Sequence, residues 1–73
     1  MLEVEIGQCL ITVLLHERGM SLGQLSQRTG ISTQRLSDYA NGVRPSMTIK
    51  TAKIIAIALN CSIDDLYEWR IKH

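Results

Sequence analysis

The side chains between positions 33 and 38 carry the chemistry that is needed to contact the edges of DNA base pairs. Gln34 can bond the N6 and N7 atoms of one adenine, and Asp38 can accept a hydrogen bond from the N4 amino group of a cytosine. Thr33 can offer its methyl group to a thymine, and Arg35 can reach either a guanine or a phosphate. These residues form a candidate site, provided that one structural element presents them on a single surface.

Basic residues cluster in the middle of the sequence, around this candidate site. The 73-residue chain has a net charge of only +1. Residues 18–53, however, carry six basic residues against one acidic residue, a net charge of +5: the basic residues are Arg18, Arg28, Arg35, Arg44, Lys50 and Lys53. Such an asymmetry favours contact with phosphate, although an ordinary solvated surface explains the charges equally well.

The sequence lacks the residue patterns of catalytic, metal-binding and membrane proteins. It contains no nucleophile–base pair or phosphate-binding loop, so we expect no enzymatic activity. No Cys-x-x-Cys or His-x-x-x-His spacing gathers metal ligands, so we expect no metal. We also expect no cofactor and no small-molecule ligand. The longest apolar run, residues 54–59, is too short to cross a bilayer. We therefore expect a soluble, cytoplasmic protein.

Helical periodicity predicts five short helices in one domain that spans residues 1–73. Apolar residues recur at helical spacing within residues 4–18 and residues 48–59, and a further capped helix is expected to start at Ser62. Two shorter helices are expected at residues 22–29 and 32–40. No segment shows a clear strand signal. We therefore predict an all-α fold.

Capping residues and a glycine mark the two short central helices. Ser21 and Gln24 can form a capping box at the start of the first, and Gly30 can end it in a left-handed conformation. Ser32 can cap the second. Because only two residues separate the helices, they must turn sharply against each other, as in a helix-turn-helix.

From this point the sequence resembles a known family. Over residues 19–42, GMSLGQLSQRTGISTQRLSDYANG is similar to the helix-turn-helix of the lambda-repressor-like, or Xre, family, and ALNCSIDDL at residues 58–66 is similar to its closing segment. The resemblance covers roughly residues 6–69. It implies a five-helix lambda-repressor-like DNA-binding domain with the helix-turn-helix at about residues 21–40.

The resemblance also implies roles for individual residues. The helix at residues 32–40 would lie in the major groove, with Leu36 and Tyr39 facing the core. The residues that would read bases are Thr33, Gln34, Arg35, Ser37 and Asp38. The residues that would contact phosphates are Ser21, Ser32, Asn41, Arg44 and Lys50, although each can equally be a helix cap or a solvated group.

Two residues depart from the family pattern and leave the function open. Leu22 stands where the family usually has a glutamine that touches DNA, and Asp38 stands where many members carry a neutral or basic residue. Asp38 would repel phosphate unless it reads a base. The first hypothesis is a sequence-specific transcriptional regulator, in particular a repressor, that binds double-stranded DNA and is encoded by a prokaryote, phage or mobile element. The alternative is an antitoxin or adaptor that keeps the fold but binds a protein partner.

The helices contain more apolar residues than one buried face requires. A helix that is apolar on several sides must be buried on several sides, and in so small a chain a second copy would provide that burial. We therefore expect a homodimer, which would recognise an inverted repeat with half-sites about 34 Å apart. In the alternative, residues 1–6 fold back over the excess apolar surface. Candidate interface residues are Leu10, Val13, Ile54, Ile57, Tyr67, Trp69 and Ile71.

Overall fold

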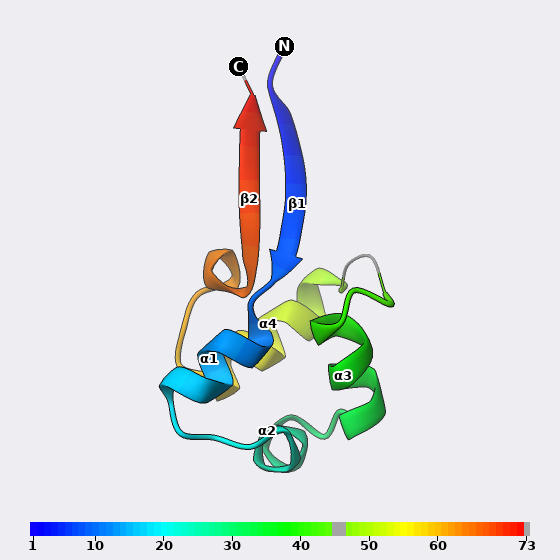
Figure 1. Cartoon of the computed structure of the whole chain (residues 1–73), viewed down its shortest axis with the longest axis vertical. Coiled ribbons are helices and arrows are strands. Elements are labelled where there is room, and N and C mark those ends of the chain that lie inside the picture. Colours follow the sequence, from blue (N-terminus) through cyan, green and yellow to red (C-terminus); the bar gives the residue numbers. More distant parts are fainter. Residues whose placement is uncertain (45–46, 73) are drawn as a thin grey trace.

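The computed structural model describes residues 1–44 and 47–72 and places the helices at one end of the molecule (Figure 1). A two-stranded ribbon projects from them, so the molecule measures 41 × 21 × 19 Å, and both termini lie at the far end of the ribbon. In the described part of the chain, no helix is long and apolar enough to span a membrane. In chain order the elements are β1 (Glu3–Cys9), α1 (Ile11–Glu17), α2 (Leu22–Thr29), α3 (Thr33–Ala40), α4 (Ile49–Ala58), the 3₁₀ turn η1 (Ile63–Leu66) and β2 (Tyr67–Lys72).

The antiparallel pair of β1 and β2, here called the terminal ribbon, shows that the prediction of an all-α, five-helix fold is wrong. Residues 4–9 lie in β1, so the first helix begins at Ile11 and not near residue 4. The helix expected after Ser62 is a four-residue 3₁₀ turn that leads directly into β2. Residues 1–44 and 47–72 therefore contain four α-helices and one two-stranded sheet.

Alternating side chains explain why both ends of the chain are strands. In β1, Val4 and Ile6 alternate with glutamates, and in β2, Trp69 and Ile71 alternate with charged residues. This period of two suits a strand, and β-branched and aromatic residues favour that conformation. Each strand also supplies the other with backbone partners, since Val4 lies opposite Ile71 and Ile6 lies opposite Trp69.

A β-bulge connects the terminal ribbon to the helices. Ile6 pairs with Trp69 but Cys9 pairs with Tyr67, so β1 carries one more residue than β2 between these two pairs. A Cβ atom on Gly7 would lie only 3.0 Å from the Cβ atom of Glu68, so glycine permits the close approach of the strands. Because of the extra residue, Cys9 lies on the same face of the ribbon as Ile6.

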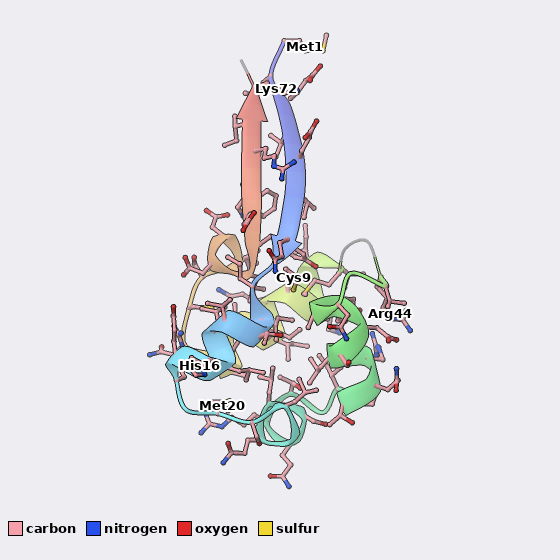
Figure 2. All side chains as sticks on the ribbon, in the orientation of Figure 1. Met1, Cys9, His16, Met20, Arg44 and Lys72 are labelled. Carbon is pink, nitrogen blue, oxygen red and sulfur yellow. The ribbon has the colours of Figure 1, made fainter. Side chains whose placement is uncertain are left out.

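Cys9 and Tyr67 anchor the base of the ribbon in the core. Both are buried, and Figure 2 shows Cys9 at the junction between ribbon and helices. Burial raises the pKa of the Cys9 thiol and raises the pKa of Tyr67 to about 12, because the charged form of each group loses hydration. Both side chains are therefore neutral at physiological pH.

The hydrophobic core lies between the helices and this base. Leu25, Leu36 and Ile55 contribute one fully buried side chain each from α2, α3 and α4. The expected inward orientation of Leu36 and Tyr39 is confirmed, with exposed fractions of 0% and 5%. The buried residues are Cys9, Ile11, Leu14, Leu15, Leu25, Ile31, Leu36, Tyr39, Ala52, Ile55, Ala56, Leu59, Leu66 and Tyr67.

Candidate nucleic-acid interface

Polar side chains fix the starts of α2 and α3. The Ser21 Oγ accepts a hydrogen bond from the Gln24 backbone N–H at 3.1 Å, and the Ser21 N–H donates to Gln24 Oε1 at 2.8 Å. This is the capping box that the sequence predicts. The Ser32 Oγ accepts from the Arg35 backbone N–H at 3.2 Å at the start of α3. The caps satisfy amides that have no partner within the helix, so both helices begin at defined residues.

The turn between α2 and α3 is held by two hydroxyl groups that the sequence patterns did not reveal. Gly30 ends α2 in a left-handed conformation, with φ of 74°. The Ser26 Oγ then donates to the carbonyl oxygen of Ile31 at 2.6 Å, and the Ile31 N–H donates to Thr29 Oγ1 at 3.2 Å. Ile31 is buried in the core. In the sequence, these two hydrogen bonds are indicated only by the position of Ser26 and Thr29 near the end of a helix, where hydroxyl side chains often bond to the backbone.

One face of α3 is buried and the opposite face is exposed. Residues three or four positions apart share a helix face, so Thr33 and Gln34 lie beside Ser37 and Asp38. Arg35 lies at the border of this face, where its Nη2 donates to the hydroxyl oxygen of Tyr39 at 3.3 Å. The five candidate base-reading residues are thus brought together on α3: Thr33, Gln34 and Arg35 are exposed, and Ser37 and Asp38 are half-buried.

Asp38 connects a candidate base-reading residue to a candidate phosphate-contacting residue. The Gln34 Nε2 donates to Asp38 Oδ1 at 3.0 Å, and the Arg44 Nε lies 3.8 Å from Asp38 Oδ2. The backbone carbonyl oxygen of Asp38 accepts from the N–H groups of Val43 at 2.9 Å and Arg44 at 3.3 Å. The Arg44 guanidinium also lies 5.9 Å from the centre of the Tyr39 ring. The carboxylate therefore orients both of its neighbours.

These contacts change the interpretation of Asp38. Arg44 offsets part of its negative charge, which reduces the repulsion between the carboxylate and a nearby phosphate. Gln34 uses one N–H for Asp38 and keeps its carbonyl oxygen and second N–H for another partner. The sequence signal for this arrangement was a Gln–Asp pair at i, i+4 spacing on one helix.

The candidate phosphate-contacting residues lie around α3 on several elements. The Ser21 and Ser32 hydroxyl oxygens accept the cap hydrogen bonds, but each hydroxyl can still donate its own proton. The Asn41 Nδ2 donates to the Ser37 Oγ at 3.1 Å, which places it directly after α3. Lys50 is exposed in the first turn of α4. Arg44 and Asn41 are therefore tied to α3 by contacts, whereas Ser21 and Lys50 lie on neighbouring elements.

Two arginines of the basic middle segment stabilise the end of α4. Arg18 Nε donates to the carbonyl oxygen of Leu59, and Arg28 Nη1 lies 3.5 Å from the carbonyl oxygen of Ala58. The last carbonyl groups of a helix lack partners within it and carry partial negative charge. The net charge of +5 in the sequence therefore overstates the number of cations that are free to face a ligand.

The apolar residues that were proposed for a dimer are distributed over the molecule. Val13 is exposed on α1, and Ile54 and Ile57 are exposed on α4. Leu10 is half-buried, Tyr67 is buried in the core, and Trp69 and Ile71 are exposed on β2. Residues 1–6 do not cover the helices, because Glu3–Ile6 pair with β2 instead. Leu22, the first residue of α2, packs against the core.

Comparison with known proteins agrees with this geometry. Residues 11–70 match the profile of the family described as the Cro/C1-type HTH DNA-binding domain. The chain belongs to this family. The resemblance to lambda-repressor-like proteins is thereby confirmed, and the match includes the helix-turn-helix formed by α2 and α3. β1 lies before the matched residues, so the terminal ribbon is only partly covered by the family profile.

Three proteins of Bacillus subtilis (strain 168) are similar to the chain. YopS, an SPbeta prophage-derived HTH-type transcriptional regulator, is 49% identical over 72 residues, which cover 99% of this chain and 97% of YopS. YotL, another SPbeta prophage-derived HTH-type transcriptional regulator, is 44% identical over 59 residues, which cover 81% of this chain and 74% of YotL. The HTH-type transcriptional regulator YozG is 38% identical over 60 residues, which cover 82% of this chain and 71% of YozG. The similarity to YopS thus includes the terminal ribbon.

Proposed function

We propose that the protein is a transcriptional repressor that binds an inverted-repeat DNA operator as a homodimer. The family is a DNA-binding one, and the relatives carry the names of transcriptional regulators. The observation that carries the proposal is the pair of Gln34 and Asp38, whose side chains are 3.0 Å apart on the exposed face of the second helix of the motif. The prophage origin of two relatives supports a protein encoded by a phage or mobile element and acting in the bacterial cytoplasm.

Base recognition follows from placing the exposed face of α3 in the major groove. Gln34 keeps one N–H and its carbonyl oxygen free, which is the pair of groups that adenine N7 and N6 require. Thr33 and Ser37 lie on the same face, where the Thr33 methyl group would contact a thymine. Asp38 is half-buried on this face and would contact a cytosine, and Arg35 at its border would contact a guanine or a phosphate. Specificity therefore arises from α3 alone.

Phosphate contacts would hold α3 in register with the bases. Ser21 and Ser32 present hydroxyl groups and backbone amides at helix starts, which favour an anion. Asn41, Arg44 and Lys50 would contact the backbone on the other side of α3. Of these residues Arg44 offers a full positive charge and a side chain that is 49% exposed. It is therefore expected to contribute most to sequence-independent affinity.

The first test is the selection of binding sites from random duplex DNA by the purified protein at two salt concentrations. We expect an inverted repeat with half-sites about one helical turn, or 34 Å, apart. Binding should weaken as salt rises, because contacts with phosphates release counterions. A selection that recovers no shared motif at either salt concentration would contradict the proposal.

Two substitutions test the assignment of roles. Gln34→Ala should relax the preference at one base pair of each half-site, whereas Arg44→Ala should weaken binding to all sequences alike and reduce the salt dependence. The matched control for the lost charge is Arg70→Ala, since Arg70 is exposed on β2 at the opposite end of the molecule from α2. Equal binding of every DNA by both variants and the parent would show that α3 does not lie in the groove as proposed.

Two features favour a second function, that of a module that binds a protein partner. Leu22 packs against the core and offers no polar group to DNA, and an acidic residue lies on the exposed face of α3. An antitoxin or adaptor that keeps the fold and binds a protein would share both features. Weak DNA binding at low salt and none at physiological salt would favour this alternative.

A further inference from the structure

The terminal ribbon has one continuous apolar face. Residues opposite each other in an antiparallel pair point to the same side, and so do alternate residues within a strand. Val4 with Ile71 and Ile6 with Trp69 therefore share a face, and Leu2 continues the alternation before β1. The β-bulge keeps Cys9 and Tyr67 on this face as well. The face is thus buried by the helices at its base and continues beyond them towards the termini (Figures 1 and 2).

The opposite face of the ribbon is charged. Glu3 lies opposite Lys72 and Glu5 lies opposite Arg70, and the Lys72 Nζ is 4.0 Å from the Glu5 Oε1. Each acidic residue of β1 is thus matched by a basic residue of β2. These charges are satisfied on the solvated face, so the apolar face contains no charged side chain between Leu2 and Ile6 or between Trp69 and Ile71.

The apolar face is large for so small a protein. The exposed fractions are 62% for Leu2, 53% for Val4, 44% for Ile6, 38% for Trp69 and 57% for Ile71. Together these side chains expose on the order of 450 Å² of apolar surface, a size at which patches on soluble proteins mark interaction sites. By contrast the exposed large apolar residues of the helices are divided between two elements, with Val13 on α1 and Ile49, Ile54 and Ile57 on α4.

A two-stranded sheet with nothing on its apolar face is only marginally stable in water. The helices of the same chain cover the base of the ribbon but do not extend along its length (Figure 1). A second layer about 10 Å away is the usual way in which a sheet covers such a face. Among residues 1–44 and 47–72, none forms such a layer along the length of the ribbon, so a layer from outside these residues would stabilise it.

We propose that this layer is the same face of a second copy, so that two terminal ribbons pack face to face about a two-fold axis. An uncharged apolar face is complementary to itself, and every molecule presents it at the same concentration. Two copies would bury on the order of 900 Å² of apolar surface, and with the polar rim this approaches the roughly 1,200 Å² of a specific interface. With the axis along the ribbon, β1 of one copy would lie across from β2 of the other, and the charged faces of both ribbons would point outward to solvent.

This inference deepens the proposed function by naming the surface that makes the repressor a dimer. α2 lies at the end of the molecule opposite to the ribbon tip, and α3 lies beside the other helices (Figure 1). Packing of the ribbons would therefore leave the exposed face of α3 free for DNA. With both helical bodies at the same end of the paired ribbons, the two copies of α3 could contact one side of a duplex.

Trp69 provides a direct test, because it is the single tryptophan of the chain and lies on the proposed interface. Sedimentation equilibrium and tryptophan emission are measured without DNA from low micromolar to several hundred micromolar protein. We expect a monomer–dimer equilibrium in which the emission shifts to the blue and acrylamide quenching falls as dimer forms. A monomer at all concentrations, or a dimer whose Trp69 emission and quenching match those of the monomer, would overturn the proposal.

Substitutions locate the interface. Val4→Glu should abolish the dimer, and Ile71→Thr, which keeps a β-branched side chain in β2, should weaken it by about tenfold or more. Thr12→Glu adds the same charge at an exposed site on α1 and should leave dimerisation unchanged. Circular dichroism confirms that each variant is folded. A dimer that survives both ribbon substitutions would overturn the proposal, whereas a normal dimer that selects no DNA site would refute only the proposed function.

Discussion

The contact between Gln34 and Asp38 gives a prediction that separates two roles of an acidic residue at a DNA interface. Asp38→Ala removes both the negative charge and the oxygen that accepts the hydrogen bond from Gln34 Nε2 at 3.0 Å. Asp38→Asn removes the charge but keeps an amide oxygen as acceptor. Any difference between the variants therefore reports on the positioning of Gln34, since both have lost the same charge.

The expected difference in operator affinity between the two variants follows from the free-energy cost of ordering the exposed Gln34 side chain. A long polar side chain that becomes immobile on binding costs about 0.5–1.5 kcal/mol, and a preformed hydrogen bond avoids this cost. Loss of the contact in Asp38→Ala should thus weaken binding to the selected operator by about two- to twelvefold relative to Asp38→Asn. Binding to unrelated DNA should increase in both variants to the same extent, because removal of a negative charge near the phosphates is common to both.

The assay is fluorescence anisotropy with the selected operator and with a scrambled duplex, over a range of salt concentrations. The quantity to compare is the ratio of specific to non-specific affinity, which should be lowest for Asp38→Ala. The double variant Gln34→Ala/Asp38→Ala completes a double-mutant cycle. Its coupling energy should match the difference in binding free energy between Asp38→Ala and Asp38→Asn. Equal ratios for Asp38→Ala and Asp38→Asn would refute the positioning role. A changed base preference in Asp38→Asn would show that Asp38 also contacts a base directly, as its proposed contact with a cytosine requires.

Three further predictions concern stability and are measured by urea unfolding. Gly30→Ala should cost about 1 kcal/mol from its φ of 74° alone, since nothing lies within 4 Å of the new Cβ atom, and Gly30→Asn should cost less. Leu36→Ala should cost about 2–5 kcal/mol, because a fully buried side chain leaves a cavity where α2 and α3 meet. Tyr67 has a pKa of about 12 in the folded chain against about 10 unfolded, so the folded state binds its proton more tightly. The contribution of Tyr67 to the free energy of unfolding is complete below pH 10 and is lost as the pH rises towards 12, and Tyr67→Phe should remove this loss. If the free energy of unfolding of Tyr67→Phe fell with pH as steeply as that of the parent, the prediction would be wrong.

The helix-turn-helix could be predicted because its signals are local. Ser21, Gln24, Gly30 and Ser32 act through hydrogen bonds and backbone angles within a few residues of themselves, and α2 spans the predicted residues 22–29. The buried positions of Leu36 and Tyr39 follow from helical spacing alone. Local chemistry of this kind is the same in any context, so the sequence reveals it directly.

The terminal ribbon could not be predicted in the same way because its partners are far apart in the sequence. The helical spacing of apolar residues within residues 4–18 predicts a helix from residue 4, whereas the alternation around Val4 and Ile6 is a strand signal. A strand of seven residues is stable only with a partner, and that partner is β2 at the other end of the chain. The sheet is indicated only when the alternating segments at the two ends of the chain are considered together as partners.

The charge distribution shows a related limit of sequence interpretation. Arg18 and Arg28 contribute to the basic middle segment, yet both bond to carbonyl oxygens at the end of α4. The sequence likewise contains more apolar residues than the core buries, but much of the exposed apolar surface lies on the ribbon and not on the helices. Counts of residue types in the sequence thus predict a cation-rich surface and an uncovered apolar surface. The contacts in the structure show on which elements these surfaces lie. Because α3 and the ribbon face lie on different elements, Gln34→Ala should leave self-association unchanged, whereas Val4→Glu should abolish self-association and thereby weaken binding to the inverted repeat.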